Sequence, residues 1–133
     1  MFKPKETIHS LAEKGQTQKI RDFLKKDESL IRARDKFENT PLHYAAQQGN
    51  MELSRILISK KADVNAQNMK GMTALHLAVA QVQRDLCSIL INAGAKVDIK
   101  DRDGKTPLDW AIELNHRGLA EYLRRTLDQQ KPS

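Results

Sequence analysis

A short motif returns in this chain at a fixed interval of 33 residues. TPLHYAA at Thr40 comes back as TALHLAV at Thr73 and as TPLDWAI at Thr106. When residues 35–67 are laid over residues 68–100, 11 of 33 positions are identical, against about two expected from ordinary residue usage. A fixed period of this length is typical of an array in which one structural unit repeats and stacks on its neighbours.

Each motif predicts the start of a short helix. The threonine suits the N-cap, and Pro41 and Pro107 follow at the first helical position. His43 and His76 fall at N3, from which a side chain can reach back to the cap. We therefore assign these histidines to capping rather than to catalysis. Gly49 ends its helix by tolerating a left-handed conformation.

A second helix follows in each unit. Leu53, Ile56 and Leu57 have i, i+3, i+4 spacing, which is typical of one apolar stripe, and the stripe recurs 33 residues later. A single unit cannot bury such a stripe alone, so the units must stack. The pattern predicts one all-α domain over residues 1–133, a solenoid of about four helix-turn-helix units joined by extended loops that carry turn residues, which we call fingers.

The unit boundaries follow from the period. We expect a first, capping unit at residues 6–34, two internal units at 35–67 and 68–100, and a last, capping unit at 101–127. The polar residues 128–133 are expected to form a frayed tail.

Composition bounds the function. The formal net charge of +6 favours acidic partners at low salt. Cys87 is the single cysteine, so an internal disulfide is excluded, no zinc or other metal site is expected, and a reducing, cytoplasmic location fits best. A nuclear, periplasmic or secreted location stays open. No apolar run approaches the ~18 residues of a membrane span, and we expect no cofactor.

These features resemble the ankyrin-repeat family: the 33-residue period, Thr-Pro-Leu-His-x-Ala-Ala, the glycine that closes the first helix, and Ala-Asp-Val-Asn after the second. The first unit carries the resemblance through its second helix alone. Gly71 and Gly104 lie two residues before the threonines of the later motifs, and Glu38 takes this position before Thr40. The missing glycine predicts a less regular first finger. The resemblance implies a curved stack of helix pairs with β-turn finger loops, which binds proteins through its fingers and first helices, without catalysis.

The resemblance also implies the contact positions, carried over by register. They are Lys36, Phe37, Asn39, Gln47 and Gln48 in the second unit; Met69, Lys70, Met72, Ala80 and Gln81 in the third; and Arg102, Asp103, Lys105, Glu113 and Leu114 in the fourth. Phe37, Met69, Met72 and Leu114 are apolar at positions that stacking does not need, which suggests a partner surface. The alternative is local packing between neighbouring fingers.

Other residues allow a chemical and a structural interpretation. Family members can be hydroxylated at an asparagine like Asn65 in Asp-Val-Asn, but we favour the simpler interpretation that Asn65 tolerates the geometry of the turn. His9 and His116 have no acidic or cysteine neighbour in register. Trp110 takes the repeat position of Tyr44, so we expect it to be a core or half-buried packing residue of the first helix rather than an isolated binding hot spot.

The sequence favours a monomeric, non-enzymatic adaptor or scaffold that binds a protein partner, possibly an acidic one. The alternatives are an inhibitor or immunity-type protein that blocks a partner enzyme, and a regulator of nucleic-acid-binding proteins. Direct nucleic-acid binding is disfavoured, because no aromatic platform or recognition helix accompanies the basic residues.

Overall fold

The computed structural model describes residues 6–131, and this part of the chain contains helices and no strand, as the sequence predicts. The first helices of the four units are α1 (Ile8–Glu13), α3 (Pro41–Gln47), α5 (Ala74–Ala80) and α7 (Pro107–Glu113). The second helices are α2 (Thr17–Lys26), α4 (Met51–Ser59), α6 (Arg84–Asn92) and α8 (Arg117–Gln130), and a 3-10 helix, η1 (Glu28–Arg32), follows α2.

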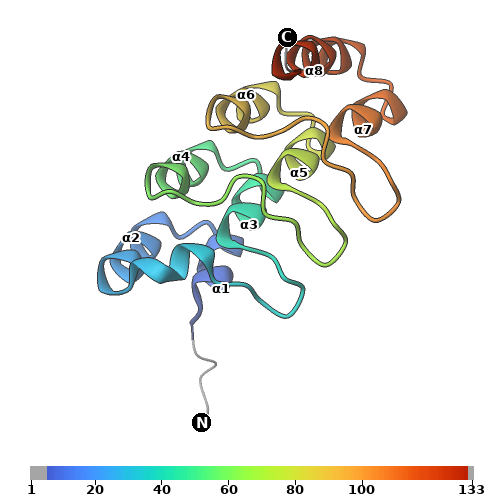
Figure 1. Ribbon diagram of the computed structural model, residues 1–133. Coiled ribbons are helices and arrows are strands. Elements are labelled where there is room, and N and C mark those ends of the chain that lie inside the picture. The colour runs from blue at the N-terminus through green and yellow to red at the C-terminus, as the bar shows by residue number, and fades with distance from the viewer. Residues whose placement is uncertain (1–5, 132–133) are drawn as a thin grey trace.

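The two sets of helices form two rows. Figure 1 shows α1, α3, α5 and α7 stacked in one row and α2, α4, α6 and α8 in the other. Three long loops project from the first-helix row, on the side away from the second helices. We call them the first finger (residues 35–39), the second finger (68–72) and the third finger (101–105). The predicted all-α solenoid is confirmed.

Every first helix begins at a threonine that caps it, at positions 7, 40, 73 and 106. In each case the N3 side chain also accepts a hydrogen bond from the backbone of the cap, so all four helices have a capping box. The sequence predicts three of these starts. It misses α1, because Ile8 and Ser10 replace the proline and histidine of the second unit, although Thr7 lies in register with Thr40.

The first helices end in the left-handed conformation. Gly49 has φ of 68°, Val82 of 56° and Asn115 of 58°. The predicted role of Gly49 is confirmed, and the same turn is made by two residues with side chains. Val82 is the least suited of the three, because a β-branched residue is strained at positive φ.

The apolar stripes form one continuous core. Three positions of the repeat are buried in all four units, and each of these side chains has at most 2% of its surface exposed. They are an alanine in the first helix (Ala12, Ala45, Ala78 and Ala111) and two aliphatic residues in the second helix (Ile20, Leu53, Leu86 and Leu119; Leu24, Leu57, Leu90 and Leu123). Full burial of one such leucine contributes roughly 1.5–3 kcal/mol. The stack is therefore held by contacts between units.

The C-terminal end differs from the expected tail. Helix α8 continues to Gln130. The Gln130 side chain accepts a hydrogen bond from the Val97 amide at 3.0 Å and donates one to the Ala95 carbonyl at 2.9 Å. Residues 128–130 are helical for this reason, which their polar sequence does not reveal, and residues 132 and 133 lie outside the described part.

The outer face of the last unit leaves one apolar residue open. Ile112 in α7 is 48% exposed, whereas Val79, at the same position of α5, is fully buried by the next unit. Arg124 of α8 is exposed on this last unit, where the internal units have isoleucine. Between residues 6 and 131, no helix is both long and apolar enough to cross a membrane.

Candidate functional site

A side-chain oxygen at one repeat position shapes each finger. Asp35 Oδ1 accepts hydrogen bonds from the amides of Phe37 and Asn39, at 2.9 and 3.0 Å. Asn68 and Asp101 make the same two contacts in the second and third fingers. Such a side chain satisfies the amides of a tight loop and fixes its conformation. Sequence reasoning missed this position, because exchange between Asp and Asn hides its 33-residue recurrence.

The first finger is as regular as the others, so the expectation based on Glu38 is wrong. Glu38 has φ of 61°, close to 76° for Gly71 and 77° for Gly104. Its amide donates to the Asp35 carbonyl at 2.9 Å, and the Gly71 amide makes the equivalent bond at 2.9 Å. The Asp35 side chain holds the loop in this shape although a non-glycine residue occupies the left-handed position.

Backbone hydrogen bonds tie the fingers into one row. The Met69 amide donates to the Phe37 carbonyl at 2.9 Å, and the Arg102 amide donates to the Lys70 carbonyl at 3.0 Å. Both bonds join residues at the tips of neighbouring fingers. The three fingers therefore present one connected edge rather than three independent loops.

The two motif histidines connect each first helix to the next finger. His43 Nδ1 accepts from the amide of its capping threonine at 3.0 Å, and His76 Nδ1 does so at 3.1 Å. The proton is therefore on Nε2, which donates to the Met72 carbonyl from His43 and to the Lys105 carbonyl from His76, each at 2.9 Å. Burial lowers the pKa of both rings. Their predicted capping role is confirmed.

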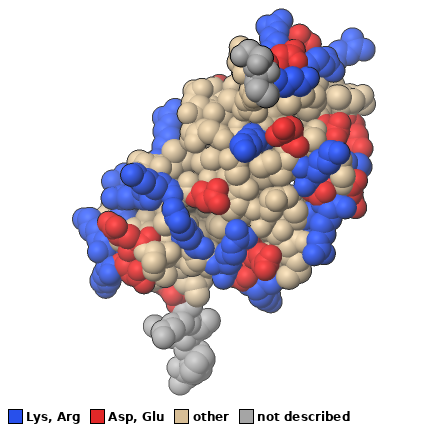
Figure 2. Space-filling view, viewed as in Figure 1, with Lys and Arg blue, Asp and Glu red and all other residues tan. Residues whose placement is uncertain are grey.

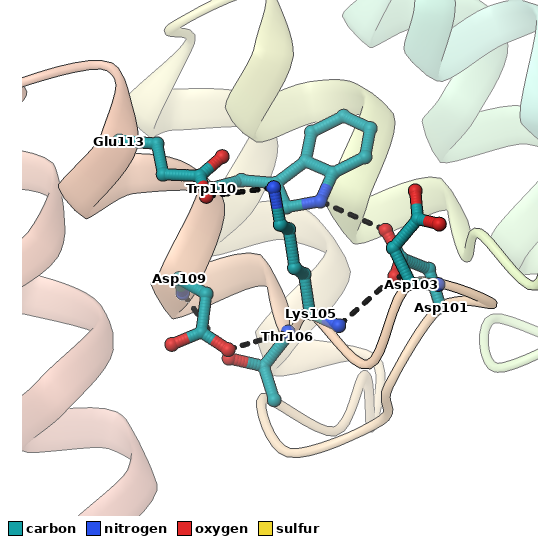
Figure 3. A network of polar contacts seen from close by, with 7 residues as sticks. All are labelled: Asp101, Asp103, Lys105, Thr106, Asp109, Trp110 and Glu113. Carbon is teal, nitrogen blue, oxygen red and sulfur yellow. Dashed lines mark hydrogen bonds and ion pairs between the residues drawn. The ribbon is translucent and has the colours of Figure 1, made fainter.

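In the first and third fingers, the aspartate of the finger accepts a hydrogen bond from an aromatic side chain of the helix that follows the finger. The Tyr44 hydroxyl donates to the second carboxylate oxygen of Asp35. Figure 3 shows the equivalent contact in the last unit, where the Trp110 indole N–H donates to Asp101 at 2.9 Å. Trp110 also packs edge-on against His76, with ring centroids 5.3 Å apart. It is half-buried, as the sequence predicts.

These donors affect the acidity of the two aspartates. Burial alone would raise the pKa of Asp101, but hydrogen bonds from the Lys105 amide, the Trp110 indole and the Asp103 amide outweigh it and lower the pKa. The pKa of Asp35 is lowered by the equivalent set of donors, again against the effect of burial. Both side chains are consequently charged acceptors at neutral pH.

A hollow lies between the first two fingers and the first helices behind them. Its volume is about 260 Å³, and it is lined by Phe37, Asn39, Gln47, Asn68, Met69, Lys70, Met72 and Leu77. We call it the finger hollow. Phe37 is 51% exposed and Met69 is 45% exposed, so apolar surface faces solvent here. The Lys36 ammonium lies 5.1 Å from the centroid of the Phe37 ring.

The candidate contact residues divide into two groups by exposure. Asn39, Met72 and Lys105 are half-buried; the Asn39 side chain accepts from Asn68 Nδ2 at 2.9 Å. The others are exposed: Lys36, Phe37, Gln47, Gln48, Met69, Lys70, Ala80, Gln81, Arg102, Asp103, Glu113 and Leu114. Six of the fifteen candidates line the finger hollow. Sequence reasoning missed two further lining residues, Asn68 and Leu77.

The candidates of the last unit do not join the hollow. Lys105 and Glu113 form an ion pair with each other, at 2.7 Å, as Figure 3 shows. Leu114 is 48% exposed at the end of α7. In the view of Figure 2, acidic residues are interleaved with Lys and Arg along the edges of the molecule. A uniform basic face, typical of nucleic-acid binding, is not seen in this view.

Asn65 connects two units. Its side chain donates to the Gly94 carbonyl at 3.1 Å and accepts from the Lys96 amide at 2.9 Å. Both functions of the side-chain amide are thus used in the turn of the next unit. This arrangement supports the structural interpretation, and hydroxylation at Asn65 stays a prediction.

The remaining reactive side chains are accounted for structurally. Cys87 is fully buried, and burial raises its pKa to about 12. His9 Nε2 lies 2.7 Å from the Ala33 carbonyl. Within residues 6–131, no group of three or more His, Cys, Asp or Glu side chains is placed to hold a metal ion.

Comparison with known proteins agrees with this geometry. A family model described as ankyrin repeats in three copies matches residues 8–101 and 60–132. The chain is similar to a Caenorhabditis elegans homolog of transient receptor potential cation channel subfamily A member 1, with 38% identity over 64 residues. It is also similar to an ankyrin repeat protein of Rickettsia bellii, with 36% identity over 64 residues, and to delta-latroinsectotoxin-Lt1a of Latrodectus tredecimguttatus, with 37% over 67.

These similarities extend over part of each protein. The matched stretches cover 48%, 44% and 50% of this chain, and 5%, 38% and 6% of the respective relatives. The chain therefore shares the repeat with these relatives rather than their whole length.

Proposed function

The chain belongs to the ankyrin-repeat family, and on this premise we propose that it is a non-enzymatic adaptor or scaffold that holds a protein partner on its fingers and first helices. Ankyrin repeats indicate a protein–protein interaction module. The adaptor role is supported chiefly by one observation: Phe37 and Met69 expose apolar surface beside the finger hollow. Exposed aromatic and methionine side chains at a preformed concave site are common anchors for partners.

The partner is expected to carry acidic groups. Lys36, Lys70 and Arg102 are exposed on the three fingers, and the chain has a net charge of +6. Complementary charge mainly accelerates association, so the association rate should fall as salt is added. We propose a monomer in a reducing compartment such as the cytoplasm, where a single cysteine stays reduced.

Affinity capture with matched variants tests the proposal. The double variant Phe37→Ala, Met69→Ala should weaken binding of the captured partner about tenfold or more, because loss of each anchor costs roughly 1 kcal/mol or more. Ile112→Ala is the control, since Ile112 is 48% exposed on the outer face of the last unit, at the position where Val79 is buried by the next unit, and does not line the finger hollow. Binding is measured by isothermal calorimetry, and folding by circular dichroism.

Two results would contradict the proposal: unchanged affinity of the folded double variant, or an equal loss in the Ile112 control. The identity of the partner separates the remaining alternatives. An enzyme whose activity stops on binding would indicate an inhibitor, and a nucleic-acid-binding protein would indicate a regulator.

A further inference from the structure

The junction between the first and second units lacks the side-chain bridge of the next junction. Asn65 uses its amide to bind the Gly94 carbonyl and the Lys96 amide. The equivalent residue one repeat earlier is Arg32. The flanking register is kept, because Ile31 is buried like its counterpart Val64.

Arginine cannot make the same bridge. The positions equivalent to Gly94 and Lys96 are Lys61 and Asp63. A guanidinium group only donates hydrogen bonds, so Arg32 cannot accept one from the Asp63 amide. Among the described residues, no hydrogen bond from the Asp63 amide to an acceptor is found.

A groove is present at this junction. It has a volume of about 500 Å³ and is lined by Arg32, Arg34, Thr40, Lys61, Ala62, Asp63, Val64 and Ala66. We call it the basic groove. It shares no lining residue with the finger hollow, so it is a separate feature of the surface.

The groove presents positive charge and hydrogen-bond donors. Arg32, Arg34 and Lys61 form no ion pair with any carboxylate in the described chain. Arg34 is held by the carbonyls of Glu38 and Gln67, at 3.1 and 2.7 Å, which leaves its other N–H groups available.

One acidic side chain also lines the groove. Asp63 accepts a hydrogen bond from the Asn65 amide at 3.0 Å, so one of its oxygens is used within its own turn. Three cations and one carboxylate leave the lining residues with a net charge of +2. In Figure 2, Lys and Arg side chains lie on the side of the molecule that carries α2 and α4, with some Asp and Glu side chains between them.

We propose that the basic groove is a binding site for a phosphate group. A phosphate dianion matches the net charge of the lining residues, and its oxygens supply the acceptors that Arg32, Lys61 and the Asp63 amide lack. Arginine is the residue best suited to bind phosphate through two parallel hydrogen bonds. Because the cationic side chains are exposed, the affinity for inorganic phosphate alone should be weak, in the millimolar range.

Two variants separate this site from a purely structural feature. Arg32→Asn installs the bridging residue of the next junction, and Lys61→Gly installs the residue found at Gly94. Lys61 has φ of 68°, where glycine is unstrained. Both variants should therefore be at least as stable as the parent protein in thermal unfolding, yet bind phosphate at least about tenfold more weakly because a charged donor is lost.

The full chain is titrated with sodium phosphate, and the backbone amide shifts are monitored by NMR. Sodium chloride is exchanged for phosphate so that the ionic strength stays constant. Saturable shifts at residues 61–64, lost in Arg32→Asn and Lys61→Gly, would support the site. Lys96→Gln is the charge-matched control, because Lys96 lines a different hollow, and it should bind phosphate as the parent does.

The proposal is overturned if these shifts are absent, if they persist in both variants, or if Lys96→Gln weakens them equally. Two peptides identify the source of the phosphate group. Tighter binding of a phosphoserine peptide than of inorganic phosphate would assign the site to phosphorylated protein segments, and equal binding would assign it to small phosphorylated molecules. A control peptide has glutamate in place of phosphoserine. If it binds as tightly as the phosphoserine peptide, the groove is not a phosphate site.

Discussion

At the scale of single residues, backbone conformation sets which substitutions stabilise this protein. The turn after each first helix requires positive φ, and glycine, asparagine and valine occupy it in different units. Glycine and asparagine reach this region with little strain, whereas a β-branched side chain does not. Val82 is 38% exposed, so a substitution there changes the strain at positive φ with little change in core packing.

Val82→Gly should therefore stabilise the protein. Relief of left-handed strain contributes roughly 1–2 kcal/mol, offset by about 0.5–1 kcal/mol for the greater chain entropy of glycine in the unfolded state. The expected net gain of roughly 0.5–1 kcal/mol can be measured by urea unfolding. Val82→Asn, which installs the residue found at Asn115, should act in the same direction, and a loss of stability in both variants would contradict the strain argument.

At the scale of elements, the fingers are held by contacts with their neighbours as well as by their own turns. Gly71 and Gly104 have nearly the same φ, 76° and 77°, but different surroundings. A Cβ on Gly71 would lie 2.8 Å from the backbone nitrogen of Arg102, whereas a Cβ on Gly104 would meet no atom within 4 Å. The second finger is thus packed against the third, which has no such neighbour.

Alanine substitutions separate conformation from contact. Gly104→Ala should cost about 1 kcal/mol through positive φ alone. Gly71→Ala should cost about 1 kcal/mol more, because the third finger must shift. Glu38 carries a side chain at the equivalent place of the first finger, so folding itself should survive. If urea unfolding shows the same loss of stability for Gly71→Ala and Gly104→Ala, the contact between the second and third fingers does not add to the cost.

The histidine contacts between first helices and fingers predict a pH dependence. Burial lowers the pKa of His43 and His76 below the ordinary value of 6.5, so the folded chain binds fewer protons than the unfolded chain just below pH 6.5. Their contribution to stability is complete above pH 6.5 and is lost as the pH falls from there toward the folded-state pKa. Urea unfolding between pH 7.5 and 5 should show this decline.

A variant identifies the source of the decline. His76→Gln keeps a polar N3 side chain that can return to the cap but has no proton to gain. Its stability should fall less between pH 7.5 and 5 than that of the parent. An unchanged slope would exclude His76 as a contributor. Asp35 and Asp101, whose pKa values are lowered below 3.8, lose their contribution only at more acidic pH.

At the scale of the whole molecule, the continuous core makes the units depend on one another. Leu57 and Leu90 are fully buried between neighbouring units. Each unit therefore has an incomplete core on its own, as expected for a stacked array. A short array of this kind should unfold in one transition rather than unit by unit.

Leu90→Ala tests this coupling. The cavity should lower the free energy of unfolding by about 2–5 kcal/mol, with coincident curves from circular dichroism and from the fluorescence of Trp110 in the last unit. Reaction of Cys87 with a thiol reagent should accelerate in parallel, because its thiol is buried in the core. Leu114→Ala, at a half-exposed position, should change stability by less than about 0.5 kcal/mol. Separate transitions would contradict a single cooperative stack.

The repeating unit, its caps and its buried seam can be predicted from the order of residues alone. These features depend on spacing within one unit, and Thr40, Leu57 and Leu90 occupy the predicted environments because helical geometry is local. The same spacing predicts that Phe37 and Met69 lie on the surface, as they do, although their role in binding remains a proposal.

The way in which neighbouring units meet becomes visible only in three dimensions. Stacking brings Asn68 and Leu77 into the finger hollow, pairs Lys105 with Glu113, and orders Gln130 against the loop of the preceding unit. It also leaves Arg32 without the bridge that Asn65 makes. These contacts depend on the distance and angle between stacked units, which result from side-chain packing across the whole seam, and a one-dimensional period does not contain that information.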